Sequence, residues 1–103
     1  MFSLEPVTVT ARSPVIPPRY KDVTKPAYPE AARVREQEGT VVLLVKVRPD
    51  GSVGEVKIRQ TSEERLLDQA AVSAAWKWAF IPARRGPKSV EAWVEVSVKF
   101  ELE

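Results

Sequence analysis

The sequence predicts an α+β fold, in which two helices cover one face of a three-stranded antiparallel sheet. Two segments, residues 40–48 and 90–102, carry apolar side chains at alternate positions, as strands with one buried face do. Between them, residues 65–78 repeat apolar side chains at helical spacing. With 103 residues, 44% of them hydrophobic, the chain is long enough for one such domain.

The predicted order is helix, strand, strand, helix, strand. The first helix is expected at residues 29–37, where a proline opens it and a glycine follows its end. Residues 40–48 form the central strand, because their middle is almost continuously apolar. Pro49-Asp50-Gly51 predicts a tight turn, so residues 53–60 return as a second strand. In that strand we expect Val56 and Ile58 to face the core.

The second helix is expected to begin at Thr61-Ser62-Glu63-Glu64, which has the pattern of a capping box. Its apolar stripe is Leu67, Ala70, Ala71, Ala74 and Trp78, and it is expected to end at Ile81-Pro82. At its end, core packing is favoured over a binding platform for three aromatic residues, Trp76, Trp78 and Phe80. A turn over residues 84–87 then leads into the final strand, residues 90–102.

Proline divides the chain into two parts. Six of the nine prolines lie at or before position 29, and residues 12–26 mix proline with charge and have no periodic apolar face. We therefore expect residues 1–24 to be an extended segment with a linker, and residues 25–103 to be the folded domain.

Composition excludes most chemistry. The chain has no cysteine and no histidine, which removes thiolate and imidazole metal sites and the usual nucleophile pairs. A net charge of +2 is too small for a general nucleic-acid binder, and only Trp93 offers an aromatic side chain on the outer face of the sheet. We expect no catalytic residue, no metal, no cofactor and no nucleic-acid partner.

Three surface features allow more than one interpretation. Trp93 marks either a contact surface or a tolerated surface tryptophan. A basic strip across the first two strands is more typical of a solvated face than of a binding site; it comprises Lys46, Arg48, Lys57 and Arg59. The basic turn with Arg84, Arg85 and Lys88 either touches a partner or keeps a loop in water.

Six motifs in order resemble the C-terminal domain of the TonB energy-transducer family, and the resemblance covers roughly residues 25–102. They are Tyr28-Pro29-Glu30-Ala31-Ala32, Glu38-Gly39-Thr40-Val41, Pro49-Asp50-Gly51-Ser52-Val53, Leu67-Asp68-Gln69-Ala70-Ala71, Trp76-Lys77-Trp78-Ala79-Phe80-Ile81-Pro82-Ala83 and Val98-Lys99-Phe100. The resemblance implies a periplasmic coupling module, not an enzyme. It implies coupling of an inner-membrane motor, the ExbB-ExbD complex, to outer-membrane transporters, with a membrane anchor in a segment absent from this chain.

The resemblance also implies where a partner binds. Family domains capture the transporter's Ton box as an added strand on the edge of the final strand. Here that edge is Val90, Glu91, Ala92, Trp93, Val94, Glu95, Val96, Ser97, Val98, Lys99 and Phe100. Two residues are expected near the captured strand, Lys25 and Tyr28. Lys25 stands where family members tend to carry glutamine, and it can pair with an acidic residue at the start of a Ton box.

The N-terminal segment itself resembles a Ton box. It consists of Glu5, Pro6, Val7, Thr8, Val9, Thr10 and Ala11, an acidic residue followed by strand-forming Val and Thr. A chance match of a short tail is the alternative. The linker of about 13 residues extends to roughly 40 Å, far enough to reach the domain. We expect residues 5–11 to add to the final strand as an extra edge strand, in the same chain or swapped in a dimer.

A second function is the alternative to Ton-box capture. A TolA-like envelope scaffold would bind another protein or peptidoglycan without transmitting force. The long uncovered final strand favours strand capture.

Overall fold

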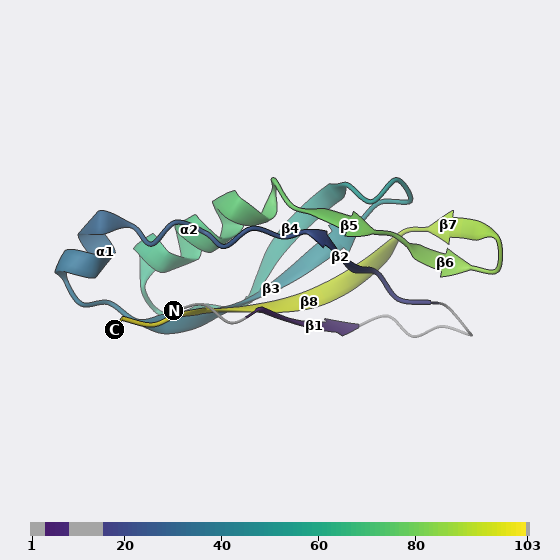
Figure 1. Cartoon of the computed structure of the whole chain (residues 1–103). Helices are drawn as coiled ribbons and strands as arrows, with labels where there is room; N and C mark the ends of the chain where they lie inside the picture. Colours follow the sequence, from purple (N-terminus) through teal and green to yellow (C-terminus); the bar gives the residue numbers. More distant parts are fainter. Residues whose placement is uncertain (1–3, 9–15, 103) are drawn as a thin grey trace.

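The computed structural model describes residues 4–8 and 16–102 (Figure 1). Within these residues, two helices and eight strands follow one another. They are β1 (Leu4–Thr8), β2 (Arg19–Asp22), α1 (Glu30–Val34), β3 (Gly39–Val47), β4 (Val53–Gln60), α2 (Arg65–Ala75), β5 (Ala79–Ile81), β6 (Ala83–Arg85), β7 (Lys88–Val90) and β8 (Ala92–Phe100). The molecule is elongated, with extents of 49 × 21 × 20 Å. No helix in the described ranges is both long and apolar enough to cross a membrane.

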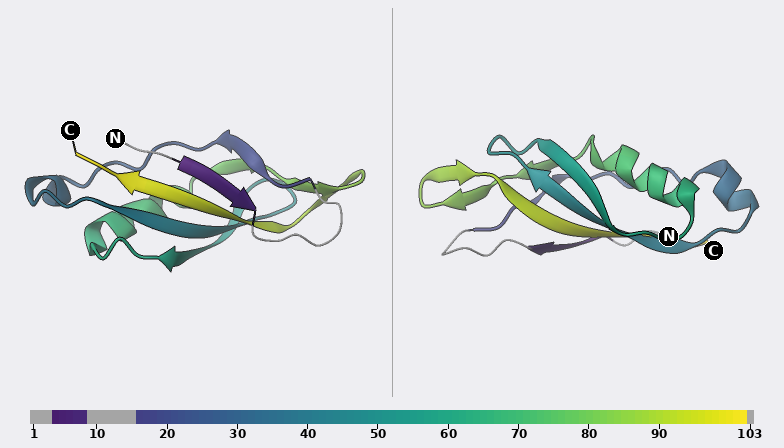
Figure 2. Two further views of the ribbon diagram at one scale, coloured as in Figure 1. Left: turned by 90° about the horizontal axis from the view of Figure 1, so that it is seen from below. Right: turned by 180° about the vertical axis from the view of Figure 1, so that it is seen from behind.

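The main sheet has the order β1-β8-β3-β4, and all its neighbours are antiparallel. The strands β8, β3 and β4 are the three that the sequence predicts. β1 adds to the outer edge of β8, as the left view of Figure 2 shows. The α+β class, the three-stranded sheet and the additional edge strand from the N-terminal segment are therefore confirmed.

The core lies between this sheet and α2, which covers one face of it (Figures 1 and 2). Alternate residues of β3 and β8 are buried: Val41, Leu43, Val45, Val47, Val94, Val96, Val98 and Phe100. α2 contributes Leu67, Ala71 and Ala75, and the two alanines let the helix lie close to the strands. The alternating pattern in the sequence is therefore the pattern of burial.

The second helix is shorter than predicted at its end. It stops at Ala75. The N–H of Trp76 still donates four residues back, to Val72, but those of Lys77 and Trp78 donate to carbonyls only three residues back. The chain then forms β5, which pairs with β2 (Arg19 opposite Ile81). This pairing also gives part of the expected linker a place on the domain. Trp78 and Phe80 are buried as predicted, whereas Trp76 is 50% exposed, so its predicted core position is wrong.

The predicted capping box does not cap the helix. α2 begins at Arg65, and the hydroxyls of Thr61 and Ser62 donate to the carboxylate of Asp68 instead. The backbone N–H of Ser62 donates to the same carboxylate at 3.0 Å. Burial raises the pKa of Asp68, but these hydrogen bonds outweigh it and hold the pKa below its usual value.

Three further expectations need correction. The first helix is only Glu30–Val34, and Pro29 lies just before it with an extended backbone. The predicted final strand is divided into β7 and β8, because residues 83–90 form a separate hairpin, β6–β7. Ile58 is 44% exposed although it was expected in the core, because β4 is the outermost strand on its side.

Candidate functional site: the outer edge of β8

The outer edge of β8 is regular along its length. β8 pairs with β3 from Ala92 opposite Val47 to Phe100 opposite Gly39 with no shift in register. On its other side, β1 pairs from Thr8 opposite Val94 to Leu4 opposite Val98, also with no shift. A regular edge presents an unbroken row of N–H and C=O groups, which an added strand needs.

The opposite edge of the sheet, on β4, is less suited to accept a strand. The β3–β4 register shifts twice, once between Val42 and Leu43 and once between Lys46 and Val47. Charged side chains also alternate along β4: Glu55, Lys57 and Arg59. Bulges and edge charges are the features that keep strands from pairing edge to edge. Of the two outer strands in the three-stranded core, β8 is therefore the better acceptor.

The predicted edge residues divide into two faces along β8. Ala92, Val94, Val96, Val98 and Phe100 point into the core. Trp93, Glu95, Ser97 and Lys99 point to the outer face, where the first three are half-buried and Lys99 is exposed. Val90 belongs to β7, and Glu91 links β7 to β8. The regular edge therefore begins at Ala92, two residues later than expected.

The Ton-box-like segment lies partly on this edge. In the register of β1, Glu5 is opposite Ser97, Pro6 opposite Val96 and Val7 opposite Glu95. Val9, Thr10 and Ala11 lie outside the described residues, so their pairing stays a prediction. The structure thus places a strand of the chain itself where the resemblance implies that a partner strand binds.

Tyr28 fixes the far end of β8. Its ring packs edge-on against Phe100 at 5.5 Å, and its hydroxyl donates a hydrogen bond to the carbonyl of Gln37. Burial, followed by the charge of Glu38, raises the pKa of Tyr28. This contact holds the segment before α1 against the end of the strand.

Lys25 lies beside α2. It lines a hollow of about 280 Å³ together with Thr24, Pro26, Ala27, Ala70, Ser73, Ala74 and Lys77. The hollow lies between the extended segment and the helix. A contact between Lys25 and a captured strand stays a prediction.

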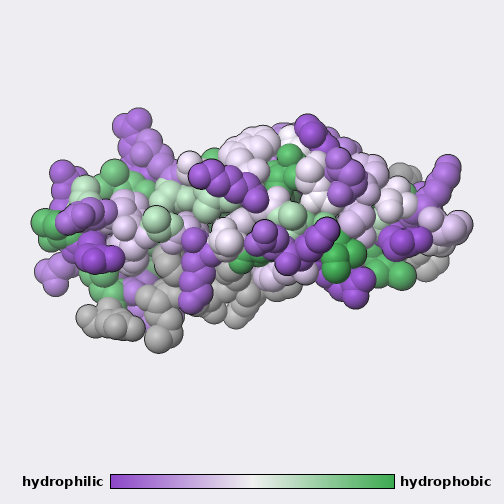
Figure 3. Space-filling model, turned by 45° about the horizontal axis from the view of Figure 1, so that its top comes forward, coloured by the Kyte–Doolittle hydropathy of each residue, from purple (hydrophilic) through white to green (hydrophobic). Residues whose placement is uncertain are grey.

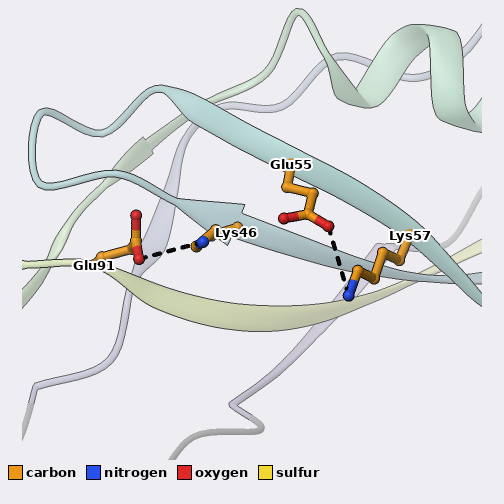
Figure 4. A network of polar contacts seen from close by, with 4 residues as sticks. All are labelled: Lys46, Glu55, Lys57 and Glu91. Atoms are coloured by element: carbon orange, nitrogen blue, oxygen red, sulfur yellow. Dashed lines mark ion pairs between the residues drawn. The ribbon is translucent and has the colours of Figure 1, made fainter.

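Ion pairs and an aromatic ring organise the outer face of the sheet. The ammonium groups of Lys46 and Lys57 lie 5.6 and 5.2 Å from the ring centre of Trp93. Lys46 also pairs with Glu91 at 3.4 Å, and Lys57 with Glu55 at 3.5 Å (Figure 4). Trp93 is therefore an anchor for two lysines.

A further ion pair joins the two outer strands of the core. Arg59 of β4 donates to Glu95 of β8 at 2.9 Å and so spans β3. Together with the pairs of Lys46 and Lys57, it balances much of the predicted basic strip, as expected for a solvated face. The sequence carries a signal for these ion pairs, since Glu91 and Glu95 stand at odd positions, as the outward-facing residues of β8 do. Only the register between strands shows which cations they meet.

No metal centre accompanies the edge. Within residues 4–8 and 16–102, no three His, Cys, Asp or Glu side chains lie together in a way that could hold a metal ion.

The fold and the edge define a class of protein: an α+β domain whose last strand carries an added edge strand, β1. A family model described as "Gram-negative bacterial TonB protein C-terminal" matches residues 24–102. The chain therefore belongs to the TonB C-terminal family. Membership agrees with the resemblance that the sequence motifs indicate.

Curated relatives of the chain are named as TonB proteins. The chain is 46% identical over 77 residues to Protein tonB2 of Pseudomonas aeruginosa, covering 75% of this chain and 28% of the relative. It is 42% identical over 82 residues to Protein TonB of Neisseria meningitidis, covering 78% of this chain and 27% of that one. The chain thus spans little more than a quarter of the length of these two relatives.

A solved structure shares the fold. The solution NMR structure of the Pseudomonas aeruginosa TonB C-terminal domain superimposes with a TM-score of 0.69 at 26% identity. The match covers 84% of this chain and 87% of that one.

Proposed function

We propose that this chain is the periplasmic coupling module of a TonB-type energy transducer. It binds the Ton box of an outer-membrane transporter as a strand added to β8, and passes on work from the ExbB-ExbD motor. In this proposal the transducer is anchored in the inner membrane. Family membership supports the general role, and the edge of β8 supports the mode of binding.

One observation carries the binding mode. The edge of β8 already holds a strand, β1, in regular antiparallel register over five positions. Strand addition relies on main-chain hydrogen bonds, so an edge that accepts one extended segment also accepts another of similar shape. β1 comes from the segment that resembles a Ton box, and we propose that it occupies the partner's place in the same chain.

Occupation by β1 has a measurable cost for an external strand. A tethered segment has an effective concentration in the range of about 1 mM. The apparent affinity of an external Ton box is then its intrinsic affinity multiplied by the fraction of time that the edge is open. The Ton box of a transporter must therefore bind strongly enough to compete with β1 for the edge of β8. Contact with peptidoglycan and exchange of β1 between two chains stay predictions.

The test compares the full chain with a variant that lacks residues 1–15. Each is titrated with a peptide covering residues 4–12 while backbone amide shifts are recorded. We expect shifts along residues 92–100 of β8 in both proteins, and tighter apparent binding to the shortened variant because its edge is open. A peptide of the same composition in scrambled order is the control.

Two outcomes would count against the proposal. Absence of binding to the shortened variant at millimolar peptide would exclude strand capture at β8. Shifts concentrated on residues 53–60 would place the acceptor edge on β4 instead.

A further inference from the structure

Residues 16–24 form a strap that runs along the domain from the hairpin β6–β7 toward α1 (Figures 1 and 2). Its outer end is held at Ile16, whose backbone exchanges two hydrogen bonds with that of Arg84, at 2.8 and 2.9 Å. Its middle is β2, which pairs with β5. At its inner end, the carbonyl of Thr24 accepts a hydrogen bond of 2.8 Å from Nε1 of Trp78. The strap is therefore held at three places along its length.

The strap is held less firmly than the strands of the main sheet. β2 and β5 pair at three positions, with a shift in register between Tyr20 and Asp22, whereas β3 and β8 pair at nine positions without a shift. Within the strap only Pro18 is buried, while Tyr20 and Val23 are half-buried against the core. In the space-filling view, which brings the side of α2 forward, hydrophobic side chains lie in separate places between hydrophilic ones (Figure 3). A segment with short pairing and little buried surface opens at a lower free energy than the core does.

The strand beneath the strap has fastenings of its own. In β5, the N–H of Phe80 donates to the carbonyl of Gly51 at 2.8 Å, and Ala79 forms a bridge with Ser52. The ring of Phe80 also packs edge-on against Trp78. β5 is thus joined to the turn between β3 and β4 without help from the strap, so it keeps its place when the strap leaves.

Beyond the strap, the chain is fastened again before α1. Pro26 is buried, and Tyr28 donates a hydrogen bond to the carbonyl of Gln37 while its ring packs against Phe100. Residues 25–28 therefore stay on the domain and mark the point at which detachment of the strap ends.

We infer that the strap detaches from the domain as one unit while the main sheet, α2 and β5 stay folded. With β1 off the edge of β8, detachment moves the point at which the domain meets its N-terminal tether, from the hairpin β6–β7 to Lys25 beside α2. The freed strap of about nine residues then spans up to roughly 30 Å. In the transducer of the proposed function, the domain thereby turns relative to its tether without unfolding. This use rests on the proposed function, whereas detachment itself does not.

Native-state hydrogen exchange of the full chain, followed for each amide by NMR, tests the inference. The N–H of Arg84 is bonded to the strap, whereas the N–H of Phe80 is bonded to Gly51. After correction for intrinsic rates, we expect Ile16, Arg84 and the hydrogen-bonded amides of β2 to exchange at one common rate. This rate is expected to be at least about tenfold faster than that of Phe80 and of residues 41–47 in β3.

A matched pair of variants locates the inner fastening. Trp78→Phe keeps an aromatic ring but removes the indole N–H that donates to Thr24. It is expected to accelerate exchange of Ile16 and Arg84 by about threefold to tenfold relative to β3, as the loss of one hydrogen bond does. Trp76→Phe is the control, because Trp76 is half exposed, and it is expected to leave these relative rates unchanged.

A third variant acts at the outer end, where it does not disturb the core. Ile16 is 56% exposed, and Ile16→Pro removes the N–H that donates to the carbonyl of Arg84. We expect faster exchange of Arg84 and of β2, with the rate of Phe80 unchanged.

Each other result overturns the inference. Exchange of Arg84 as slow as that of Phe80 would show that the strap opens only with the whole domain. Widely different rates at Ile16, β2 and Arg84 would show fraying from the outer end instead of detachment as a unit. Equal acceleration of the strap and of β3 in both Trp78→Phe and Ile16→Pro would mean that the strap has no separate stability. The peptide titration at β8 is independent of these rates, so a failure of the proposed function is seen separately.

Discussion

Gly51 shows how one residue positions the turn between β3 and β4. Its φ is +91°, a left-handed value that glycine adopts without strain. Its N–H donates to the carbonyl of Arg48, and its carbonyl accepts from the N–H of Phe80, both at 2.8 Å. A Cβ at this position would lie 2.2 Å from the carbonyl oxygen of Phe80. The turn is therefore fastened to β5 by a contact that leaves no room for a side chain.

Gly51→Ala is expected to destabilise the fold by about 3 kcal/mol, because the clash adds to the conformational penalty. Gly86→Ala is the matched control: its φ is +61°, but nothing described lies near its Cβ, so a loss of only about 1 kcal/mol is expected. Urea unfolding of both variants gives the comparison. Equal losses would show that the contact with Phe80 contributes nothing.

At the scale of elements, the end of α2 decides which tryptophan belongs to the core. Trp78 is 3% exposed, its ring packs edge-on against Phe80 at 6.4 Å, and its Nε1 donates to the carbonyl of Thr24 at 2.8 Å. It thus holds the extended segment before α1 against the domain. Trp76, only two residues earlier, borders a shallow hollow with Ile58 and Val72 and is half exposed.

Trp78→Ala is expected to cost about 3 to 5 kcal/mol, because it leaves a cavity and an unsatisfied carbonyl. Trp76→Ala is expected to cost about 1 kcal/mol or less. Thermal or urea unfolding separates the two. Similar losses would mean that the helix continues past Ala75 and buries both rings, as the sequence alone predicts.

The longer elements could be predicted because their patterns are local. In β3 and β8, burial alternates with the residues, so the sequence locates both strands and their inner faces. β2 and β5 could not be located, because each is very short and they pair with each other across a long stretch of chain. The cluster at Asp68 was missed for a related reason: Thr61 and Ser62 fit a cap equally well.

The site was predictable at the level of a strand and less so at the level of its contacts. Alternation and resemblance both indicated the last strand as an acceptor. Whether Ile58 is covered depends on how far α2 reaches across the sheet. The alternation of apolar residues within β4 carries no information about that distance. The partners of Lys46 and Arg59 depend on the register between strands, which the sequence does not state.

At the scale of the whole molecule, the question is whether β1 pairs with β8 of its own chain or with β8 of a second chain. In the structure, Thr8 pairs with Val94 and Ile16 with Arg84 of the same chain. Occupation within one chain does not depend on concentration, whereas exchange between chains does.

The full chain is therefore expected to remain a monomer from about 1 to 100 µM, where exchange cannot compete with an effective concentration near 1 mM. Light scattering after size-exclusion chromatography checks this. A dimer at 100 µM that is lost on deletion of residues 1–15 would show that β1 is swapped.

The occupied edge also has a consequence in time. A strand that arrives while β1 is in place has to wait until β1 leaves, so raising its concentration speeds binding only up to the rate of that departure. Beyond this point the observed rate levels off, whatever the partner's sequence. The dissociation of β1 then sets the maximum rate of partner binding, because every binding event has to begin with it.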